Sequence, residues 1–523
     1  MRIISAAQAA ALIGDGQTVA LGGFGAYSAP DYLLQAVAER YAGCGSPRGI
    51  TIFTGISAGN FDKENGMGLS RLSARGLIGT IIAGHIGNPP DIATLVGTNE
   101  IAGFTLPLGV VMHLFRAIAG KKPGVLTHVG LGTFADPRIE GCAANQKAAA
   151  QGREIVRLIE LDGEEFLLYR SFPLDACLIR GTYADERGNI SLAHEALVEA
   201  QLEIAAAVKN CGGTVIVQVE DVVQAGSLPA RQVRIPAALV DYVVKSPPEF
   251  HMQSYAAPVY RPELAGEVKK PVGSIAPLGL SLRKVIARRG AMELRPGCLV
   301  NLGIGIPSGV GNVANEEGIA ESMTLSLESG PIGGVPEAGV GFGGSVNAEA
   351  VIGIPDTFDL YDGGVLDATF LGAAEVDRDG NVNVSKFGTR CTGPGGFINI
   401  SQNSPKVCFM LSFTSGPQTL EIGGGRLDII SDGPGVKFVD RVQQITFSGS
   451  YARRKGQKVM YITERAVFEL RGEGVTLTEL APGADLERDV LGRMAFRPAI
   501  AADLRPMDAR LFREQKMGLG GQA

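Results

Sequence analysis

Short runs of β-branched and other apolar residues alternate with longer stretches in which apolar residues recur every three or four positions. The runs at 18–21, 50–53 and 78–83 predict strands, and the stretches at 29–41 and 110–119 predict helices. Glycine-rich segments connect them. Alternation of strands and helices with such connections predicts an α/β fold with a parallel sheet covered by helices.

The chain also contains an internal repeat. Three short motifs recur 192 positions later, and the matched segments are 174–176 with 366–368, 184–185 with 376–377, and 188–190 with 380–382. Nearer the start of each half, GQTVALG at 16–22 resembles GCLVNLG at 297–303. We therefore predict two related α/β domains from an internal duplication, each with a mainly parallel sheet covered by helices.

A proline-bearing stretch separates the two halves and suits an interdomain connection. We predict an N-terminal domain at 1–253, a connection at 254–280 and a C-terminal domain at 281–523. Two such domains facing each other would form a cleft, the usual place for a small-molecule site.

Composition narrows the class of protein. The 523 residues carry a net charge of -6 and have a pI of about 5.6, which argues against a nucleic-acid surface. The seven cysteines form no CxxC motif and the five histidines no HExxH, so neither a disulfide framework nor a metal site is expected. The longest apolar helical stretch, 106–120, carries His113 and Arg116 and is typical of a buried helix. With no signal peptide in the sequence, we expect a cytoplasmic protein without a membrane segment.

One carboxylate stands out in the second half. Glu328 ends the apolar run 323–327 and opens onto a glycine-rich loop at 329–334. At an ordinary pKa of about 4.3, a glutamate is ionised near neutral pH and can act as a nucleophile without an activating base. Taken alone, the pattern is more typical of an ordinary strand-ending glutamate in a solvated turn.

A second loop contains Gly393, Pro394, Gly395, Gly396 and Phe397. Glycines allow backbone N–H groups to point at a ligand, so this loop can serve as an oxyanion hole. The alternative is a tight turn between two strands.

Other motifs carry less weight. The segment 55–59 fits GxSxG, but loop-forming residues follow it where a serine hydrolase needs a helix. The segment 339–344 fits GxGxxG without an apolar strand before it, and no P-loop motif occurs. We therefore expect neither a serine hydrolase nor a dinucleotide or P-loop ATP site.

Five motifs together resemble the family I coenzyme A transferases, over nearly the whole chain and most closely in the acetate and propionate branch. They are NLGIGIP at 301–307, ESG at 328–330, YDGG at 361–364, GPGGF at 393–397 and ITERAVF at 462–468. The resemblance implies that Glu328 is the catalytic nucleophile and Gly396 the oxyanion-loop glycine. It also implies a CoA-binding set, which comprises Asn301, Gly303, Gly395, Gly396 and Phe397.

The implied reaction moves CoA from a short-chain acyl-CoA, such as acetyl-CoA or propionyl-CoA, to a short-chain carboxylate. It is a ping-pong reaction through a glutamyl-CoA thioester, with CoA as substrate and covalent intermediate, no permanently bound cofactor and no metal. The partners are then acyl-CoA and carboxylates, with no nucleic acid and no membrane, and we expect a homo-oligomer, a dimer or a tetramer. An acyl-CoA hydrolase using the same glutamate, a 3-ketoacid CoA-transferase and an inactive acyl-CoA-binding module are the alternatives.

The sequence departs from the family pattern at Leu108, which stands where members commonly have a glutamine and cannot donate a hydrogen bond to an acyl group. ENG at 64–66 copies the active-site letters of the ketoacid branch but lies in the first half. In the repeat, Gly55 rather than Glu64 corresponds to Glu328. We therefore predict that 64–66 is a surface turn.

Overall fold

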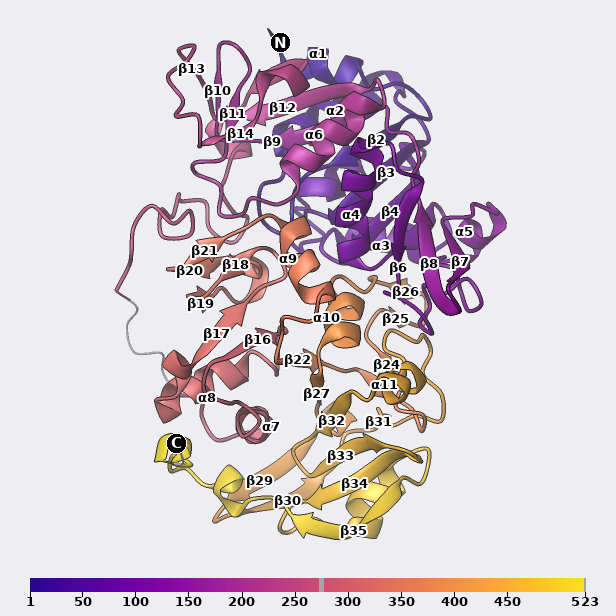
Figure 1. The fold of residues 1–523 in the computed structure, drawn as a ribbon, viewed down its shortest axis with the longest axis vertical. Coiled ribbons are helices and arrows are strands. Elements are labelled where there is room, and N and C mark those ends of the chain that lie inside the picture. Colours follow the sequence, from indigo (N-terminus) through magenta and orange to yellow (C-terminus); the bar gives the residue numbers. More distant parts are fainter. Residues whose placement is uncertain (272–276, 522–523) are drawn as a thin grey trace. The chain divides into compact units, whose positions relative to one another are not determined.

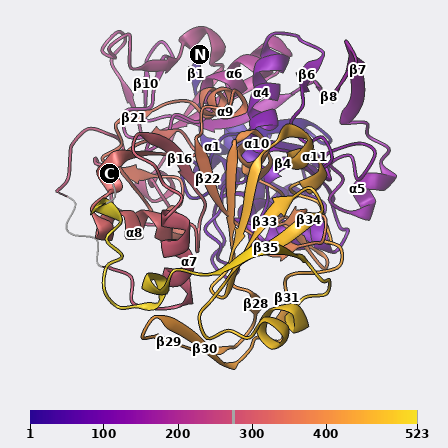
Figure 2. The same cartoon turned by 60° about the horizontal axis from the view of Figure 1, so that its bottom comes forward.

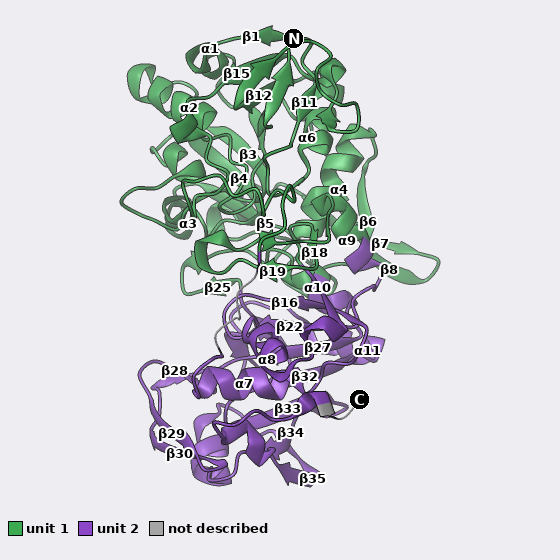
Figure 3. Ribbon diagram, turned by 90° about the vertical axis from the view of Figure 1, so that its left-hand side faces the viewer, with its two compact units in different colours: residues 1–270, 327–359, 385–399 green, residues 271–326, 360–384, 400–523 purple. Residues whose placement is uncertain are grey.

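The computed structural model describes residues 1–271 and 277–521, which form two compact units (Figure 3). Unit 1 comprises 1–270, 327–359 and 385–399, and unit 2 comprises 271–326, 360–384 and 400–523. The predicted connection at 254–280 includes 272–276, which lie outside the described residues. The predicted domain boundaries therefore stay predictions.

The main sheet of unit 1 is parallel throughout. In spatial order its strands are β1 (Arg2–Ile3), β15 (Tyr242–Lys245), β12 (Thr214–Val219), β9 (Ala176–Arg180), β2 (Thr18–Leu21), β3 (Ile50–Ile56), β4 (Ile78–His85) and β5 (Ala102–Thr105). Its central strands are buried on both faces, as expected for a parallel sheet with helices on each side.

Helices cover both faces of this sheet (Figure 1). The helices of the N-terminal 270 residues are α1 (Ala6–Ala11), α2 (Asp31–Cys44), α3 (Pro90–Gly97), α4 (Leu108–Ala119), α5 (Gln146–Ala150) and α6 (Gln201–Asn210). On one face, α1, α2 and α3 share a buried apolar cluster with Val19 and Leu21 of β2. On the other, α4 packs on β3 and β4, and α6 packs on β9 and β12. The alternation of side chains along each strand supplies both surfaces.

Further short strands complete unit 1. They are β6 (Gly124–Thr127), β7 (Val156–Leu161), β8 (Glu164–Arg170), β10 (Tyr183–Asp185), β11 (Ile190–Ser191), β13 (Asp221–Val223), β14 (Val233–Ile235), β18 (Pro331–Ile332), β19 (Val335–Pro336), β20 (Ser345–Val346), β21 (Ala350–Val351), β25 (Lys386–Phe387) and β26 (Arg390–Cys391). The pairs β18–β21, β19–β20 and β25–β26 are antiparallel. Unit 1 therefore recruits strands from three separate parts of the chain.

Unit 2 has its own sheet and its own apolar core. In order, the sheet contains β17 (Met323–Ser326), β16 (Cys298–Leu302), β22 (Ala368–Gly372), β27 (Lys406–Met410), β32 (Lys458–Ile462), β33 (Ala466–Arg471), β34 (Gly474–Leu480) and β35 (Ala499–Pro506). The strands are parallel as far as β32, and the pairs β32–β33 and β33–β34 are antiparallel. Figure 2 shows β33, β34 and β35 side by side.

The remaining elements are short. They are the strands β23 (Glu375–Val376), β24 (Val382–Asn383), β28 (Thr414–Ser415), β29 (Thr419–Gly423), β30 (Arg426–Ser431) and β31 (Gly435–Val436), and the helices α7 (Leu282–Ala291), α8 (Gly309–Glu317), α9 (Ile354–Asp362), α10 (Phe397–Asn403) and α11 (Gly449–Lys455). The division between the units falls inside α9 and inside α10.

The internal repeat of the sequence is also seen in the way that equivalent strands pair in the two units. In unit 1, β9 pairs with β12 at Cys177 and Val215, and in unit 2 β22 pairs with β27 at Thr369 and Val407. Both members of the second pair lie 192 positions after those of the first. Equal registers in equivalent strands support the duplication, and the predicted α/β fold is confirmed.

The same comparison places Gly55. In unit 1, Ala20 pairs with Phe53, and in unit 2 Asn301 pairs with Ser326. Gly55 comes two residues after Phe53, within β3, and Glu328 comes two residues after Ser326, just beyond the strand end. The two halves therefore share the same strand pairing at this point, but only the second half has a glutamate there.

The predicted elements are present. The strand at 18–21 has those bounds, and the strands begun at Ile50 and Ile78 continue to Ile56 and His85. The helix predicted at 29–41 begins at Asp31, after Pro30, and ends before Gly45, whose φ of 69° gives the left-handed conformation common after helices. The helix at 106–120 is confirmed as buried α4, and Glu64 and Asn65 are exposed in a turn, as predicted.

Candidate active site

The candidate site lies in unit 1, where its parallel strands end. The loop before α10 is anchored there, because the Gly395 N–H donates to the Gly84 carbonyl of β4 at 2.9 Å and the Gly395 carbonyl accepts from the Leu108 N–H at 2.9 Å. A glycine inside a strand is often a place where another backbone approaches closely, as Gly84 is here. The carboxyl ends of parallel strands are where open α/β folds bind ligands.

Glu328 is presented by a tight turn. The Gly330 N–H donates to the Leu327 carbonyl at 3.0 Å, and the Leu327 N–H donates to the Pro331 carbonyl at 2.9 Å. The buried hydroxyl of Ser329 donates to the Gly343 carbonyl at 2.6 Å. Gly330 has a φ of 119°, and a side chain there would overlap the Ile352 carbonyl. The turn is therefore held on both sides of the glutamate.

Gly396 lies directly against this carboxylate. Its backbone N–H donates to Glu328. A Cβ at position 396 would overlap the Glu328 Oε2 and come within 3.0 Å of the Phe358 ring. Glycine is therefore required at 396 for the contact between backbone and carboxylate.

Burial sets the protonation of Glu328. Glu328 as a whole residue is half-buried. The protein around its carboxylate excludes water, and this loss of solvation raises the pKa of the carboxyl group to about 7. The hydrogen bond from the Gly396 N–H lowers the pKa by a smaller amount. In the described part of the chain, no lysine or arginine forms a salt bridge with Glu328. A carboxylate made more basic in this way is a stronger nucleophile once it is deprotonated.

Apolar groups surround the loop. Leu108 is fully buried, and its Cδ1 lies 3.1 Å from the position that a Cβ would take at Gly55 and at Gly84. Phe397 begins α10 and is 8% exposed. The side chain at 108 therefore packs against strand ends and offers no hydrogen-bond donor.

The structure brings together part of the predicted set. Glu328, Gly395, Gly396 and Phe397 belong to unit 1. Asn301 belongs to unit 2, is 4% exposed and donates through Nδ2 to the Ser326 carbonyl at 2.9 Å.

Gly303, also in unit 2, is half-buried at the end of β16, where its N–H donates to the Phe370 carbonyl at 2.8 Å. The CoA contacts expected of Asn301 and Gly303 stay predictions.

Two site neighbours were missed by sequence reasoning. Gly84 carried a usable signal, a glycine within a buried strand. Phe358 carried none, because an aromatic residue in an amphipathic helix is typical of any core.

Neither the GxSxG segment at 55–59 nor the GxGxxG segment at 339–344 is followed directly by an α-helix. Ser57 of GxSxG is fully buried, and the segment after it contains a 3-10 helix at Gly68–Leu72, with no α-helix before α3. The segment 339–344 starts with a 3-10 turn at Gly339–Gly341. These features agree with the expectation that neither motif is a catalytic or nucleotide-binding element.

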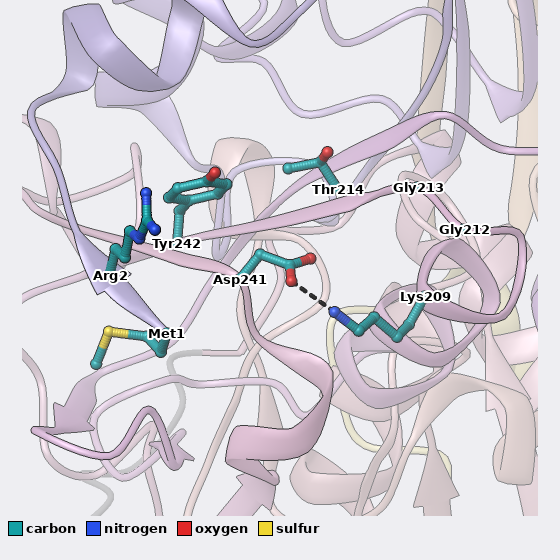
Figure 4. A pocket seen from close by; sticks show the side chains of 8 residues that line it. All are labelled: Met1, Arg2, Lys209, Gly212, Gly213, Thr214, Asp241 and Tyr242. Atoms are coloured by element: carbon teal, nitrogen blue, oxygen red, sulfur yellow. Dashed lines mark hydrogen bonds and ion pairs between the residues drawn. The ribbon is translucent and has the colours of Figure 1, made fainter.

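A pocket of about 500 Å³ opens at the amino ends of β12 and β15 (Figure 4). This edge of the unit 1 sheet is opposite the carboxyl ends, where Glu328 lies. Lys209 Nζ and Asp241 Oδ1 pair there at 2.5 Å, and Asp241 Oδ2 accepts from the Val215 N–H at 3.0 Å. These charges hold strand ends together at the edge of the sheet opposite the Glu328 loop.

Within residues 1–271 and 277–521, no cluster of three or more histidine, cysteine or acidic side chains could hold a metal ion. The same residues contain no helix that is both long and apolar enough to cross a membrane.

Comparison with known proteins gives consistent matches. The family model described as coenzyme A transferase matches residues 3–246. The caffeate CoA-transferase of Acetobacterium woodii is 46% identical, with 99% of this chain and 98% of the relative covered. The acetate CoA-transferase YdiF of Escherichia coli O157:H7 is 39% identical, with 99% and 96% covered. The solved structure of the acyl-CoA transferase YdiF from that organism, in a thioester complex with CoA, superposes with a TM-score of 0.92 at 37% identity, covering 99% of this chain and 97% of the other.

Proposed function

The chain belongs to the coenzyme A transferase family, and we propose that it transfers CoA from a short-chain acyl-CoA to a short-chain carboxylate through a thioester at Glu328. The observation that carries the proposal is the Glu328 carboxylate held against the Gly396 N–H. The solved thioester complex of a relative adds support.

The first half-reaction has two steps. A carboxylate oxygen of Glu328 attacks the thioester carbonyl carbon, the carbon–sulfur bond breaks, and an acyl-glutamyl anhydride and CoA thiolate form. The thiolate sulfur then attacks Cδ of Glu328, and the bond from Cδ to the acyl-bearing oxygen breaks. The acyl group leaves as its carboxylate, and CoA stays on Glu328. A second carboxylate reverses both steps, which is ping-pong chemistry.

The Gly396 N–H contributes when sulfur attacks Cδ. Negative charge then develops on the glutamyl oxygen that faces this donor. A fixed donor of this kind is worth about 2.7–4 kcal/mol of transition-state stabilisation in enzymes where one was removed. One thioester replaces another, so the overall free-energy change is small and the reaction needs no ATP.

We propose acetyl-CoA, propionyl-CoA or similar donors, because GPGGF at 393–397 and ESG at 328–330 resemble the acetate and propionate branch. The relatives named for acetate and for caffeate support a carboxylate acceptor. CoA is then substrate and covalent intermediate, with no permanent cofactor. We further propose a cytoplasmic homo-oligomer, a dimer or a tetramer.

The test is to incubate the protein with propionyl-CoA alone and search by mass spectrometry for CoA attached to the peptide that contains Glu328. Glu328→Ala should lack the adduct and lose transfer to acetate. Glu64→Ala, in the exposed turn at 64–66, is the matched control and should keep both. Full transfer activity in Glu328→Ala would contradict the proposal, and CoA release that does not depend on acetate would identify a hydrolase.

A further inference from the structure

A small cavity of about 10 Å³ lies inside unit 1, with room for about one water-sized group. Its walls come from the ends of β2 and β3, from α4 and α6, and from the start of α9. The lining residues include Gly23, Gly55, Ile56, Met112, Glu199 and Ile354. Most of these side chains are apolar, and the carboxyl group of Glu199 is the exception.

Glu199 is buried, with 3% of its surface exposed. Its Oε2 accepts from the Gly23 N–H at 2.8 Å and from Gln201 Nε2 at 3.0 Å. Its Oε1 is shielded from solvent and has no partner at hydrogen-bonding distance and angle. The nearby Ser28 hydroxyl donates to Glu195 Oε2 at 2.8 Å and acts to lower the Glu199 pKa, against the larger effect of burial. Burial raises the pKa of Glu199 to about 8, so the group carries a proton at neutral pH and can donate from the unpartnered oxygen.

This arrangement is costly for a purely structural residue. A buried polar atom without a partner costs about 1–3 kcal/mol. The Glu199 backbone also has a φ of 55°, which is strained for a residue with a side chain. Such strain is typical of functional positions.

The cavity is close to the nucleophile. Ile56 lines it, and the Ile56 Cδ1 lies 3.7 Å from the position that a Cβ would take at Gly395. The Glu328 Oε1 lies 4.0 Å from that same position. Ile56 therefore lines the cavity and also lies close to the loop that contacts Glu328.

We propose that Glu199 is a specificity-determining residue, which donates a hydrogen bond from Oε1 to a hydroxyl or keto oxygen on a short acyl group carried at Glu328. The oxygen substituent would occupy the cavity, and Met112 and Ile354 would contact the carbon chain. This inference rests on the proposed function and adds to it a preference among acyl groups.

The test compares kcat/KM for lactate, 3-hydroxybutyrate and acetoacetate with kcat/KM for propionate, using acetyl-CoA as donor. Glu199→Leu removes the donor and should lower the ratio for at least one oxygen-bearing acid by about tenfold or more, while propionate changes less than threefold. Glu199→Gln should keep the ratio, because its amide oxygen can accept from Gly23 and Gln201 while its NH₂ group faces the cavity. Glu203→Gln, a carboxylate on α6 that does not line the cavity, is the matched control and should match the wild type.

Equal losses for propionate and for all three oxygen-bearing acids in a folded Glu199→Leu would show a structural role and overturn the proposal. So would a wild-type protein that uses none of the three acids. If Glu199→Leu does not fold, Ile204→Phe fills the cavity from another wall and should lower the same ratio; an unchanged ratio there also overturns the proposal. Wild-type protein that forms no CoA adduct at Glu328 would instead refute the proposed function, so the two failures are distinguishable.

Discussion

Burial raises the pKa of the Glu328 carboxyl to about 7, so its protonated and ionised forms coexist near neutral pH. The protonated form cannot attack a thioester. The pKa of Glu328 lies close to neutral pH. Neither its position in the sequence nor the ordinary pKa of a glutamate side chain indicates this.

The first prediction concerns pH and rate. The rate of CoA attachment from propionyl-CoA should rise about tenfold per pH unit below pH 7 and level off above it. Stopped-flow or quench measurements of adduct formation between pH 5 and 9 test this. A flat profile over that range would contradict the pKa assigned to Glu328.

The second prediction concerns pH and stability. The folded pKa of Glu328 lies above the unfolded value of about 4.5, so the folded state holds this proton more tightly and loses stability as pH rises toward 7. Glu328→Gln removes the buried charge and keeps an acceptor for Gly396. The variant should be more stable than wild type by on the order of 1–3 kcal/mol at pH 8, with no advantage at pH 4.5. Thermal melts at the two pH values measure the difference.

The third prediction concerns Gly396. Gly396→Ala places a methyl group on the Glu328 carboxylate and against Phe358. Transfer activity should fall at least about 100-fold, because the carboxylate must move off the N–H donor. Gly43→Ala, in α2 with open space around it, is the control and should keep activity. Wild-type kinetics in Gly396→Ala would rule out the close contact.

At the scale of elements, two matching turns show what duplication preserves. Asn189 donates to Asp185 through its N–H at 2.9 Å and its Nδ2 at 3.0 Å. Asn381 makes the same two bonds to Asp377, at 2.9 and 3.0 Å. The pKa values of the two aspartates are nevertheless shifted in opposite directions from the ordinary value.

Their surroundings explain the difference. At Asp185, desolvation raises the pKa, but hydrogen bonds from Asn189, Gly226 and Arg187 outweigh it and lower the pKa to about 2. At Asp377, desolvation is the larger effect and raises the pKa. The ionised aspartate therefore stabilises the turn in unit 1, whereas in unit 2 the fold disfavours the ionised form.

The fourth prediction follows. Asp185→Asn should lower the free energy of unfolding by about 1–2 kcal/mol at pH 7, and Asp377→Asn should lower it less. The stability that Asp185 contributes is present above its unfolded pKa of about 3.8 and is lost as pH falls through about 2. Melting temperatures of both variants at pH 7 test this, and a larger loss in Asp377→Asn would contradict it.

At the scale of the molecule, unit 1 is not one continuous stretch. Segments 327–359 and 385–399 complete it. They supply Asn399, which accepts from the Gly109 N–H at 3.1 Å, and Asp359, which pairs with Arg116 at 2.6 Å.

The fifth prediction is that a fragment of residues 1–270 will not fold as it does in the whole chain. Without those two segments, the start of α4 and the buried Tyr27, which donates to the Gly341 carbonyl at 2.7 Å, lose their partners. The fragment should bind an apolar dye and melt without a sharp transition, whereas the full chain should not bind the dye. A cooperative melt of the fragment would contradict the prediction.

The sequence by itself determined the α/β class and the repeat, and it offered a candidate acid and a candidate glycine loop as separate motifs. These follow from local signals, namely periodicity, glycine spacing and matched motifs. Strand ends were less certain, because β3 and β4 continue for residues whose burial depends on their neighbours.

Only the tertiary structure decided the rest. Glu328 and Gly396 meet although 67 residues separate them along the chain, and Glu199 lines a cavity whose walls come from five elements. The pKa values of these acids depend on how much solvent the folded chain removes from them. That quantity is set by packing across the whole unit, and no local pattern of residues contains it.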